Sequence, residues 1–267
     1  MRGADLVPLA LVGALAGVVG FAFVRQPHVV QPKPVLGPDP STVATIPIDI
    51  VDSAPTHPQT GARPGGAPAS RLPYASDPIL EEISRRMQYG AAGTYIREAY
   101  EGRTFVARWP DGRADPLRIW VQPFAKLRDW NSANPAAARD GIGRWSDAGI
   151  PVRMIFVVDS SEADVIVVWA DTLPGRIGQA QRSINRKYHY VRAEITIALH
   201  HSIDPTPFGT EMIRATAAHE AGHMLGLDHS PYQDDIMHSG LNRQIDPSGR
   251  DLLTMRLLYT LPPGRFR

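Results

Sequence analysis

Three histidines recur at positions i, i+4 and i+10 in the segment HEAGHMLGLDHS, residues 219–230. Residues four apart lie on one face of a helix, so His219 and His223 can direct their imidazoles at one cation. Gly226 can adopt the left-handed conformation that ends a helix, and the resulting turn brings His229 back as a third ligand. Three nitrogen ligands leave one position open, which is typical of catalytic zinc sites rather than structural ones.

Glu220 follows the first histidine and therefore lies beside the metal without facing it in the same way. A carboxylate in this place can take a proton from a metal-activated water. The five fixed positions of HExxHxxGxxH match by chance somewhere in such a chain roughly once in 10⁵ sequences. The motif therefore predicts a zinc site with Glu220 as general base, and a coincidental group of histidines is a poor alternative.

Hydrophobic periodicity and turn residues predict the helices and strands that could position these residues. The sequence predicts helices from about Asp77 to Gly90 and over 94–100, 131–148, 211–225 and 248–260. Strands are predicted over 104–109, 117–122, 152–158, 163–169, 175–181 and 190–199, and the run RSINRKYH, residues 182–189, reads as a polar loop. The fold class is α+β. His200 and His201 are expected at the surface near a strand end.

The N-terminal part of the chain has a different composition. Residues 6–24 form an uncharged apolar run that, at 1.5 Å per residue, can just cross a bilayer core of roughly 30 Å. Residues 1–24 are therefore expected to be a signal anchor or a cleaved signal peptide. The protein would then be membrane-anchored with an extracytoplasmic catalytic domain, or secreted. Residues 25–77 are proline-rich and read as a disordered linker, 78–103 as a helical N-terminal extension, and 104–267 as the catalytic domain.

The amino-acid composition limits which residues can bind a metal and which classes of partner are expected. The chain has no cysteine, which excludes disulfides, thiolate catalysis and cysteine-ligated zinc. The formal net charge is +1 and no basic stripe stands out, so nucleic acid is not an expected partner. We expect a monomer that acts on protein or peptide substrates and meets the membrane through its N-terminal helix.

Beyond the three histidines, DDIMHSG places Met237 eight residues after His229. With this methionine the chain resembles the metzincin metallopeptidases, whose motif is followed by a methionine turn. Ser230, directly after the third histidine, makes the resemblance closest to the matrixins, the matrix-metalloproteinase-like branch. The resemblance covers roughly residues 104–267. It implies a zincin fold: a twisted, mixed five-stranded sheet with an antiparallel edge strand, an active-site helix and a C-terminal helix.

The same resemblance implies a zinc-dependent endopeptidase with one catalytic Zn²⁺. An extended substrate would lie along the edge strand near Ile177 and Gly178, with Met237 as an apolar floor beneath the histidines. The chain departs from the family pattern at Gln179, where animal matrixins have a histidine of a second zinc site, so no structural zinc is expected and calcium is doubtful. His238 and Ser239 replace the usual Tyr-Pro, so the substrate preference does not carry over.

Two other functions remain open from the sequence. One is a catalytically silent zinc-binding adhesion or interaction domain, although Glu220 argues against it because a binding module needs no base there. The other is a zinc amidase that acts on cell-wall peptides, which the sequence does not exclude.

Overall fold

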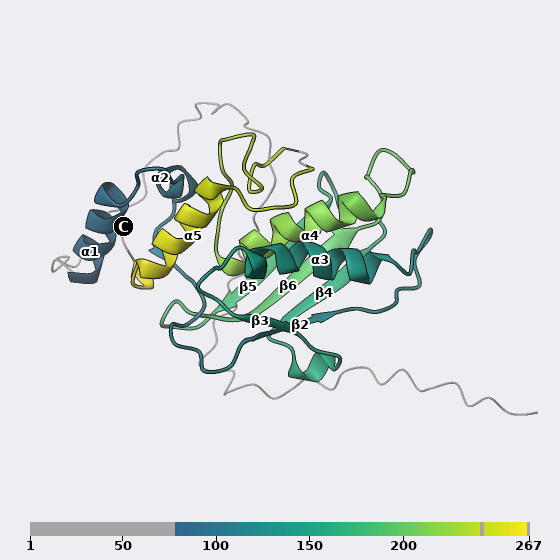
Figure 1. Cartoon of the computed structure of the whole chain (residues 1–267), viewed down its shortest axis with the longest axis horizontal. Coiled ribbons are helices and arrows are strands. Elements are labelled where there is room, and N and C mark those ends of the chain that lie inside the picture. Colours follow the sequence, from purple (N-terminus) through teal and green to yellow (C-terminus); the bar gives the residue numbers. More distant parts are fainter. Residues whose placement is uncertain (1–77, 241–242, 266–267) are drawn as a thin grey trace, which may run out of the picture. The chain divides into compact units, whose positions relative to one another are not determined.

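A computed structural model of the protein describes residues 78–240 and 243–265 (Figure 1). Helices and strands alternate only partly along the chain, as the hydrophobic patterns predict. The helices are α1 (Pro78–Tyr89), α2 (Ile96–Ala99), α3 (Asn134–Asp147), a 3-10 turn (Ser160–Glu162), α4 (Thr210–Leu225) and α5 (Gly249–Thr260). The strands are β1 (Phe105–Val106), β2 (Leu117–Val121), β3 (Met154–Phe156), β4 (Val165–Ala170), β5 (Gly178–Ile184), β6 (Tyr190–Ala198) and β7 (Gly264–Arg265).

Five strands form one mixed sheet in the order β3-β2-β4-β6-β5. The first four are mutually parallel, and β5 runs antiparallel to β6 at the edge, with Gly178 opposite Ile197. The α+β class and the mixed five-stranded sheet with an antiparallel edge strand are therefore confirmed. The strand runs predicted over 104–109 and 117–122 do not pair with each other, because β1 pairs with β7 in a separate two-stranded sheet.

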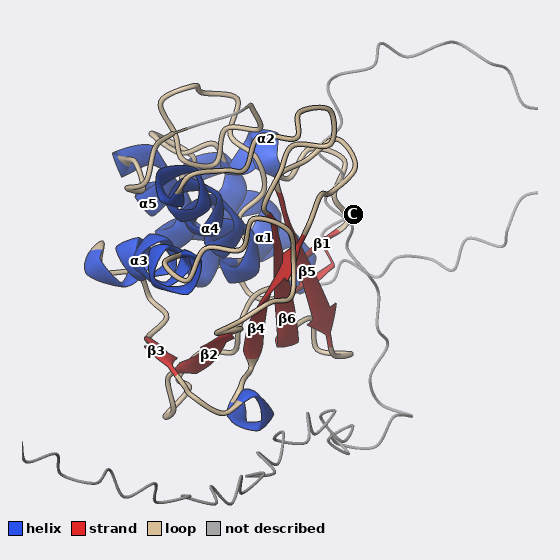
Figure 2. Cartoon of the chain, turned by 90° about the vertical axis from the view of Figure 1, so that its right-hand side faces the viewer, coloured by secondary structure: helices blue, strands red, loops and turns tan. Residues whose placement is uncertain are grey.

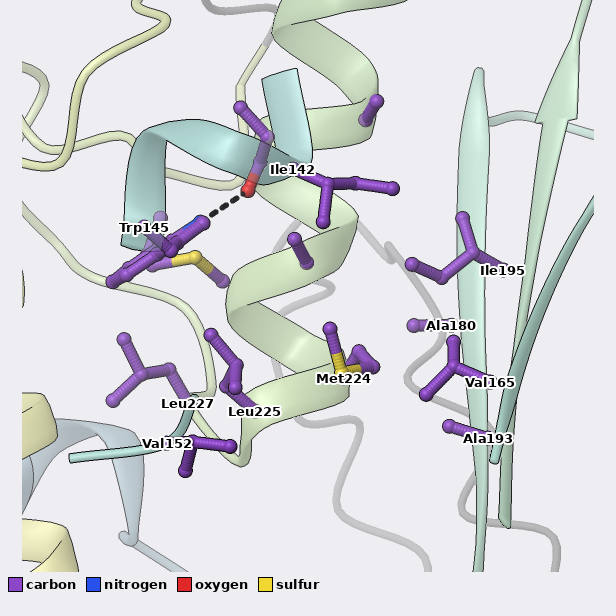
Figure 3. Close-up of a cluster of buried hydrophobic side chains, with 14 of the residues drawn as sticks. Ile142, Trp145, Val152, Val165, Ala180, Ala193, Ile195, Met224, Leu225 and Leu227 are labelled. Atoms are coloured by element: carbon purple, nitrogen blue, oxygen red, sulfur yellow. Dashed lines mark hydrogen bonds between the residues drawn. The ribbon is translucent and has the colours of Figure 1, made fainter. Parts of the chain in front are cut away.

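Helices α3 and α4 lie on one face of the five-stranded sheet (Figure 2). Alternate residues of β4 are buried, which is the pattern expected for a strand with one face on the core. Figure 3 shows Met224 of α4 facing Val165 and Ile195 of the sheet. Trp145 of α3 donates from Nε1 to the carbonyl of Ala218 at 2.8 Å, which joins the two helices by a buried hydrogen bond. The motif helix is therefore held between the sheet and α3.

Gly141 lets α3 approach α4 closely. A Cβ atom there would overlap the carbonyl oxygen of Arg214 and lie 3.1 Å from the amide nitrogen of Ala218, both backbone atoms of α4. We expect Gly141→Ala to lower the free energy of unfolding by roughly 1–3 kcal/mol, because the helices must move apart. Gly143→Ala is the matched control, since nothing lies within 4 Å of its Cβ position; it should be neutral or stabilising by up to about 1 kcal/mol. Equal urea midpoints for the two variants would contradict this account of the helix spacing.

The prediction of a loop over residues 182–189 is wrong for its first three residues. Strand β5 continues to Ile184, and its residues alternate between buried and more exposed positions. Arg182 falls on the buried side, in phase with Gly178 and Ala180, and is only 4% exposed. The polar composition of this segment led to a loop prediction. One core-facing position of the strand is occupied by a charged residue, Arg182, whose partners lie far away in the sequence.

The prediction that His200 lies at the surface is also wrong. Its side chain is fully buried, with Nε2 3.0 Å from a carboxylate oxygen of Asp129 and Nδ1 3.0 Å from one of Asp171. Hydrogen-bonding partners on both ring nitrogens offset the cost of burying the imidazole. His200 therefore ties together the loops that follow β2, β4 and β6.

The predicted N-terminal membrane or signal segment, residues 1–24, and the linker, residues 25–77, lie outside the described residues. Within residues 78–240 and 243–265, none of the helices has the length and apolar character needed to cross a membrane. The first described helix, α1, agrees with the helix predicted between Asp77 and Gly90.

Candidate metal centre

Helix α4 carries the first two histidines and ends in a sharp turn. Its C-cap, Gly226, has φ +119°, a conformation that glycine adopts without steric penalty. The Gly226 amide donates to the carbonyls of Gly222 and His223, and the Leu227 amide donates to that of Gly222. This helix stop reverses the chain and returns His229 toward the helix, as the motif predicts.

The three histidines form a compact set of nitrogen donors. One ring nitrogen from each of His219, His223 and His229 lies within 4.8 Å of the others. Nε2 of His223 is 3.2 Å from Nε2 of His229. Two nitrogens bound to a tetrahedral zinc at about 2.0–2.1 Å are separated by about 3.3 Å, so this pair fits one ion. His223 is buried, whereas His219 and His229 are partly exposed, which leaves the centre accessible from one side.

Backbone carbonyls fix the orientation of two of the rings. Nδ1–H of His219 donates to the carbonyl of Ile236 at 2.7 Å, and Nδ1–H of His223 donates to that of Leu227 at 2.8 Å. Each Nε2 therefore keeps its lone pair for a metal. Burial, together with the neighbouring His219 and His229, holds the pKa of His223 well below its ordinary value. The ring is neutral near pH 7, as a metal ligand must be.

Glu220 directly follows His219 on α4 and is only 3% exposed. Its side chain packs against the edge strand β5 at Gly178. A Cβ atom at Gly178 would overlap Oε1 of Glu220 and lie 2.7 Å from its Cγ and 2.6 Å from Cγ2 of Thr216. Gly178 is thus where the strand leaves room for the carboxylate, which brings two predicted site residues from different elements into contact.

Gly178→Ala should displace the Glu220 carboxylate without removing any metal ligand. Because a misplacement of about 1 Å costs up to about 100-fold in rate, we expect kcat to fall roughly 10- to 100-fold while zinc content is unchanged. Steady-state proteolysis and metal analysis of the same preparation test this expectation. Gly143→Ala, which adds the same methyl group at an open position of α3, should keep full activity. Wild-type kcat in Gly178→Ala would show that the strand does not set the position of Glu220.

The methionine turn packs beneath the motif helix. Met237 is fully buried, and its sulfur occupies the space that a side chain at Gly222 would need. Gly222 lies between His219 and His223 in the sequence of α4. Ser230 is bound to this turn twice: its amide donates to the Met237 carbonyl at 2.8 Å, and its hydroxyl donates to Asp235. The turn that accepts the His219 hydrogen bond is therefore itself held in place.

Two buried aspartates that the sequence reasoning missed support this turn. Burial alone would raise the pKa of Asp235, but hydrogen bonds from Arg250, Ser230 and Ser248 outweigh it and lower the pKa. Asp251 accepts the amide of Ile236 at 2.9 Å and that of Ser248 at 2.8 Å, and its own amide donates to the Ser248 hydroxyl, which forms the capping box of α5. The Ser-x-x-Asp spacing before an apolar run was a detectable signal for this cap.

Comparison with sequence models of protein families finds a match, and the matched residues include the HExxHxxGxxH motif. The sequence model of one family, described as matrixin, matches residues 131–260. The protein contains a matrixin-like metzincin domain. The match and the histidine cluster together support a zinc-dependent metallopeptidase, without specifying its substrates or the type of peptide bond that it cleaves. No curated protein matched the chain. Helices α1 and α2 and strands β1 and β2 precede the matched residues and lie outside the part of the matrixin-like domain that the family model covers.

Proposed function

We propose that the protein is a zinc endopeptidase that hydrolyses peptide bonds within protein or peptide substrates. The observation that carries this proposal is the convergence of three histidine nitrogens, with a buried carboxylate, Glu220, directly after the first histidine on the same helix. When bound, zinc supplies Lewis-acid chemistry that makes water nucleophilic near neutral pH and polarises a carbonyl group. His219, His223 and His229 would hold the ion.

Glu220 is the proposed general base. It follows His219 on α4, is only 3% exposed, and packs against Gly178 of β5. It would accept a proton from the attacking water and then deliver that proton to the nitrogen of the leaving amine. A single buried carboxylate can serve both steps because it stays in place while the peptide bond breaks.

The edge strand β5 is the proposed substrate platform. The carbonyl of Ile177 accepts the amide of Ala198 on β6 at 2.9 Å, so the Ile177 backbone is turned toward the sheet. Hydrogen-bonding directions alternate along an antiparallel strand, so the Gly178 backbone faces the open edge. An extended peptide could add there as an antiparallel strand and be recognised through its backbone. Gly178 would then contact the substrate on one side and Glu220 on the other.

A panel of substrates tests the proposal. The full chain should cleave an unfolded protein such as casein at internal bonds, and a chelator should stop the reaction until zinc is restored. Cleavage of peptidoglycan peptides alone would favour the amidase. Zinc binding without cleavage of either substrate class would favour the silent binding domain. The presence of Glu220 next to the ligands supports an enzyme over that domain.

We also propose that residues 1–24 direct the catalytic domain out of the cytoplasm, either as an anchor or as a cleaved signal. The support is the apolar run of residues 6–24 in the sequence. The full chain should float with membranes if the run is an anchor, and a chain that lacks residues 1–24 should not. Recovery of the full, uncleaved chain in the cytosolic fraction would contradict this proposal.

A further inference from the structure

The last turn of α4 is held by side chains from elsewhere in the chain. A helix leaves its final carbonyls without partners inside the helix, so they need other donors. Here the four carbonyls of residues 223–226 each accept a side-chain hydrogen bond. The donors are Arg182 to His223 at 2.7 Å, Trp109 to Met224 at 3.0 Å, Tyr259 to Leu225 at 2.9 Å and Tyr100 to Gly226 at 3.3 Å.

Asp228 extends this arrangement to the third ligand. It directly precedes His229 and is 8% exposed. Its Oδ2 pairs with Nε of Arg103 at 2.8 Å, and its Oδ1 lies 3.8 Å from Nη2 of Arg182. A buried carboxylate must be paired with a cation, and removal of one partner is costly. The backbone next to His229 is therefore fixed by an ion pair between Asp228 and two arginines.

The cluster supports the histidines and does not form a binding pocket. The cavity that Tyr100, Arg103, Arg182 and Asp228 help to line has a volume of about 20 Å³, which is room for a single water molecule. The guanidinium of Arg182 lies over the ring of Tyr190, with Cζ 5.2 Å from the ring centroid, so it is packed as well as paired. A positive charge at the C-terminal end of α4 is also favoured by the helix dipole.

Two of these groups belong to the N-terminal extension, residues 78–103. Tyr100 is the C-cap of α2, and Arg103 follows shortly after it. Both lie outside the residues that match the matrixin model. They reach the turn between His223 and His229 at Gly226 and at Asp228. The extension thus contacts the segment whose conformation sets the distance between the second and third ligands.

We propose that Tyr100 and Arg103 are positioning residues for the metal centre, so that the N-terminal extension contributes to the catalytic unit. This inference rests on the proposed zinc enzyme, but it concerns the geometry of the ligands. Tyr100 holds the Gly226 carbonyl and Arg103 holds Asp228, so together they keep His229 at bonding distance from an ion on His223.

Zinc affinity of the full chain, measured by competition with a chelator, tests the proposal. We expect Arg103→Gln to bind zinc about tenfold more weakly than wild type, as is typical when a residue that supports a ligand is lost. Arg144→Gln is the matched control: Arg144 of α3 pairs with Asp140 at 3.3 Å, and its side chain is 32% exposed, close to the 34% of Arg103, but its carboxylate partners are Asp140 and Asp246 rather than Asp228. The control should bind zinc as wild type does. Arg103→Lys, which keeps the cation, should recover part of the affinity.

The visible spectrum of the cobalt-substituted protein adds a readout that a general loss of stability would not move. Altered ligand-field bands in Arg103→Gln, with unchanged bands in Arg144→Gln, would support a change in coordination geometry. Equal zinc affinity and equal spectra for these two variants would overturn the proposal. If Arg103→Gln does not fold, Tyr100→Phe removes only the hydroxyl and should weaken zinc binding roughly two- to tenfold; unchanged affinity there would overturn it too. Failure of the wild type to bind zinc would instead overturn the proposed function.

Discussion

Glu220→Gln is expected to remove proteolysis while one zinc ion stays bound per chain. The amide has nearly the same shape as the carboxylate and fits the same space beside Gly178, but it cannot accept a proton from water. Loss of a positioned general base typically costs about 10²- to 10⁴-fold in rate. We expect kcat to fall by at least this factor, with KM changed little because substrate recognition by β5 is untouched.

Parallel measurements decide whether the loss is chemical. Casein cleavage, zinc content and the urea unfolding midpoint should be determined on the same preparations of Glu220→Gln and wild type. Retained zinc and retained stability with lost turnover would assign the proton transfer to Glu220. More than about a tenth of wild-type activity in the variant would instead mean that another group is the base.

His223→Ala is expected to abolish both zinc binding and activity. This ligand is buried between the other two histidines, and its ring also donates to the Leu227 carbonyl in the turn that carries His229. Its removal therefore deletes one ligand and loosens the segment that positions another. The zinc affinity should fall by more than the roughly 100-fold that is typical for the loss of a residue that only supports a ligand.

Thermal unfolding gives an independent measure of the same loss. A ligand that binds the folded state raises its stability with concentration, so added zinc should raise the Tm of wild type but not that of His223→Ala. His201→Ala is a suitable control, because this histidine lies in the loop before α4, away from the three ligands, and is partly exposed. A zinc-dependent Tm in His223→Ala equal to that of wild type would exclude this histidine as a ligand.

The sequence predicted the parts of the site that depend on local spacing. The i, i+4 histidines, the glycine stop at Gly226 and the helix they share follow from helix geometry alone. Strands β4 and β6 were predictable because β-branched residues and alternation mark them, whereas β5 was predicted only in its first half. The antiparallel edge strand came only from the family resemblance, since spacing does not determine which strands pair.

The parts that sequence reasoning missed depend on contacts between distant residues. Arg182 looked like the start of a loop, because its partners are the His223 carbonyl and Asp228, about forty residues further along the chain. The hydroxyl of Tyr95 donates to Asp251 across a separation of 156 residues. No local pattern encodes such pairs. A buried charge is stabilised only by groups that the fold brings next to it. Its burial could therefore be recognised only after the fold was known.

Zinc X-ray absorption of the full chain tests the central claim most directly. The protein should bind one zinc ion per chain, with three imidazole nitrogens at about 2.0–2.1 Å and one further oxygen neighbour. The spectrum of Glu220→Gln should show the same three imidazoles. A chain that binds no zinc, or a spectrum that shows fewer than three imidazoles, would contradict the assignment of His219, His223 and His229 as the catalytic metal site.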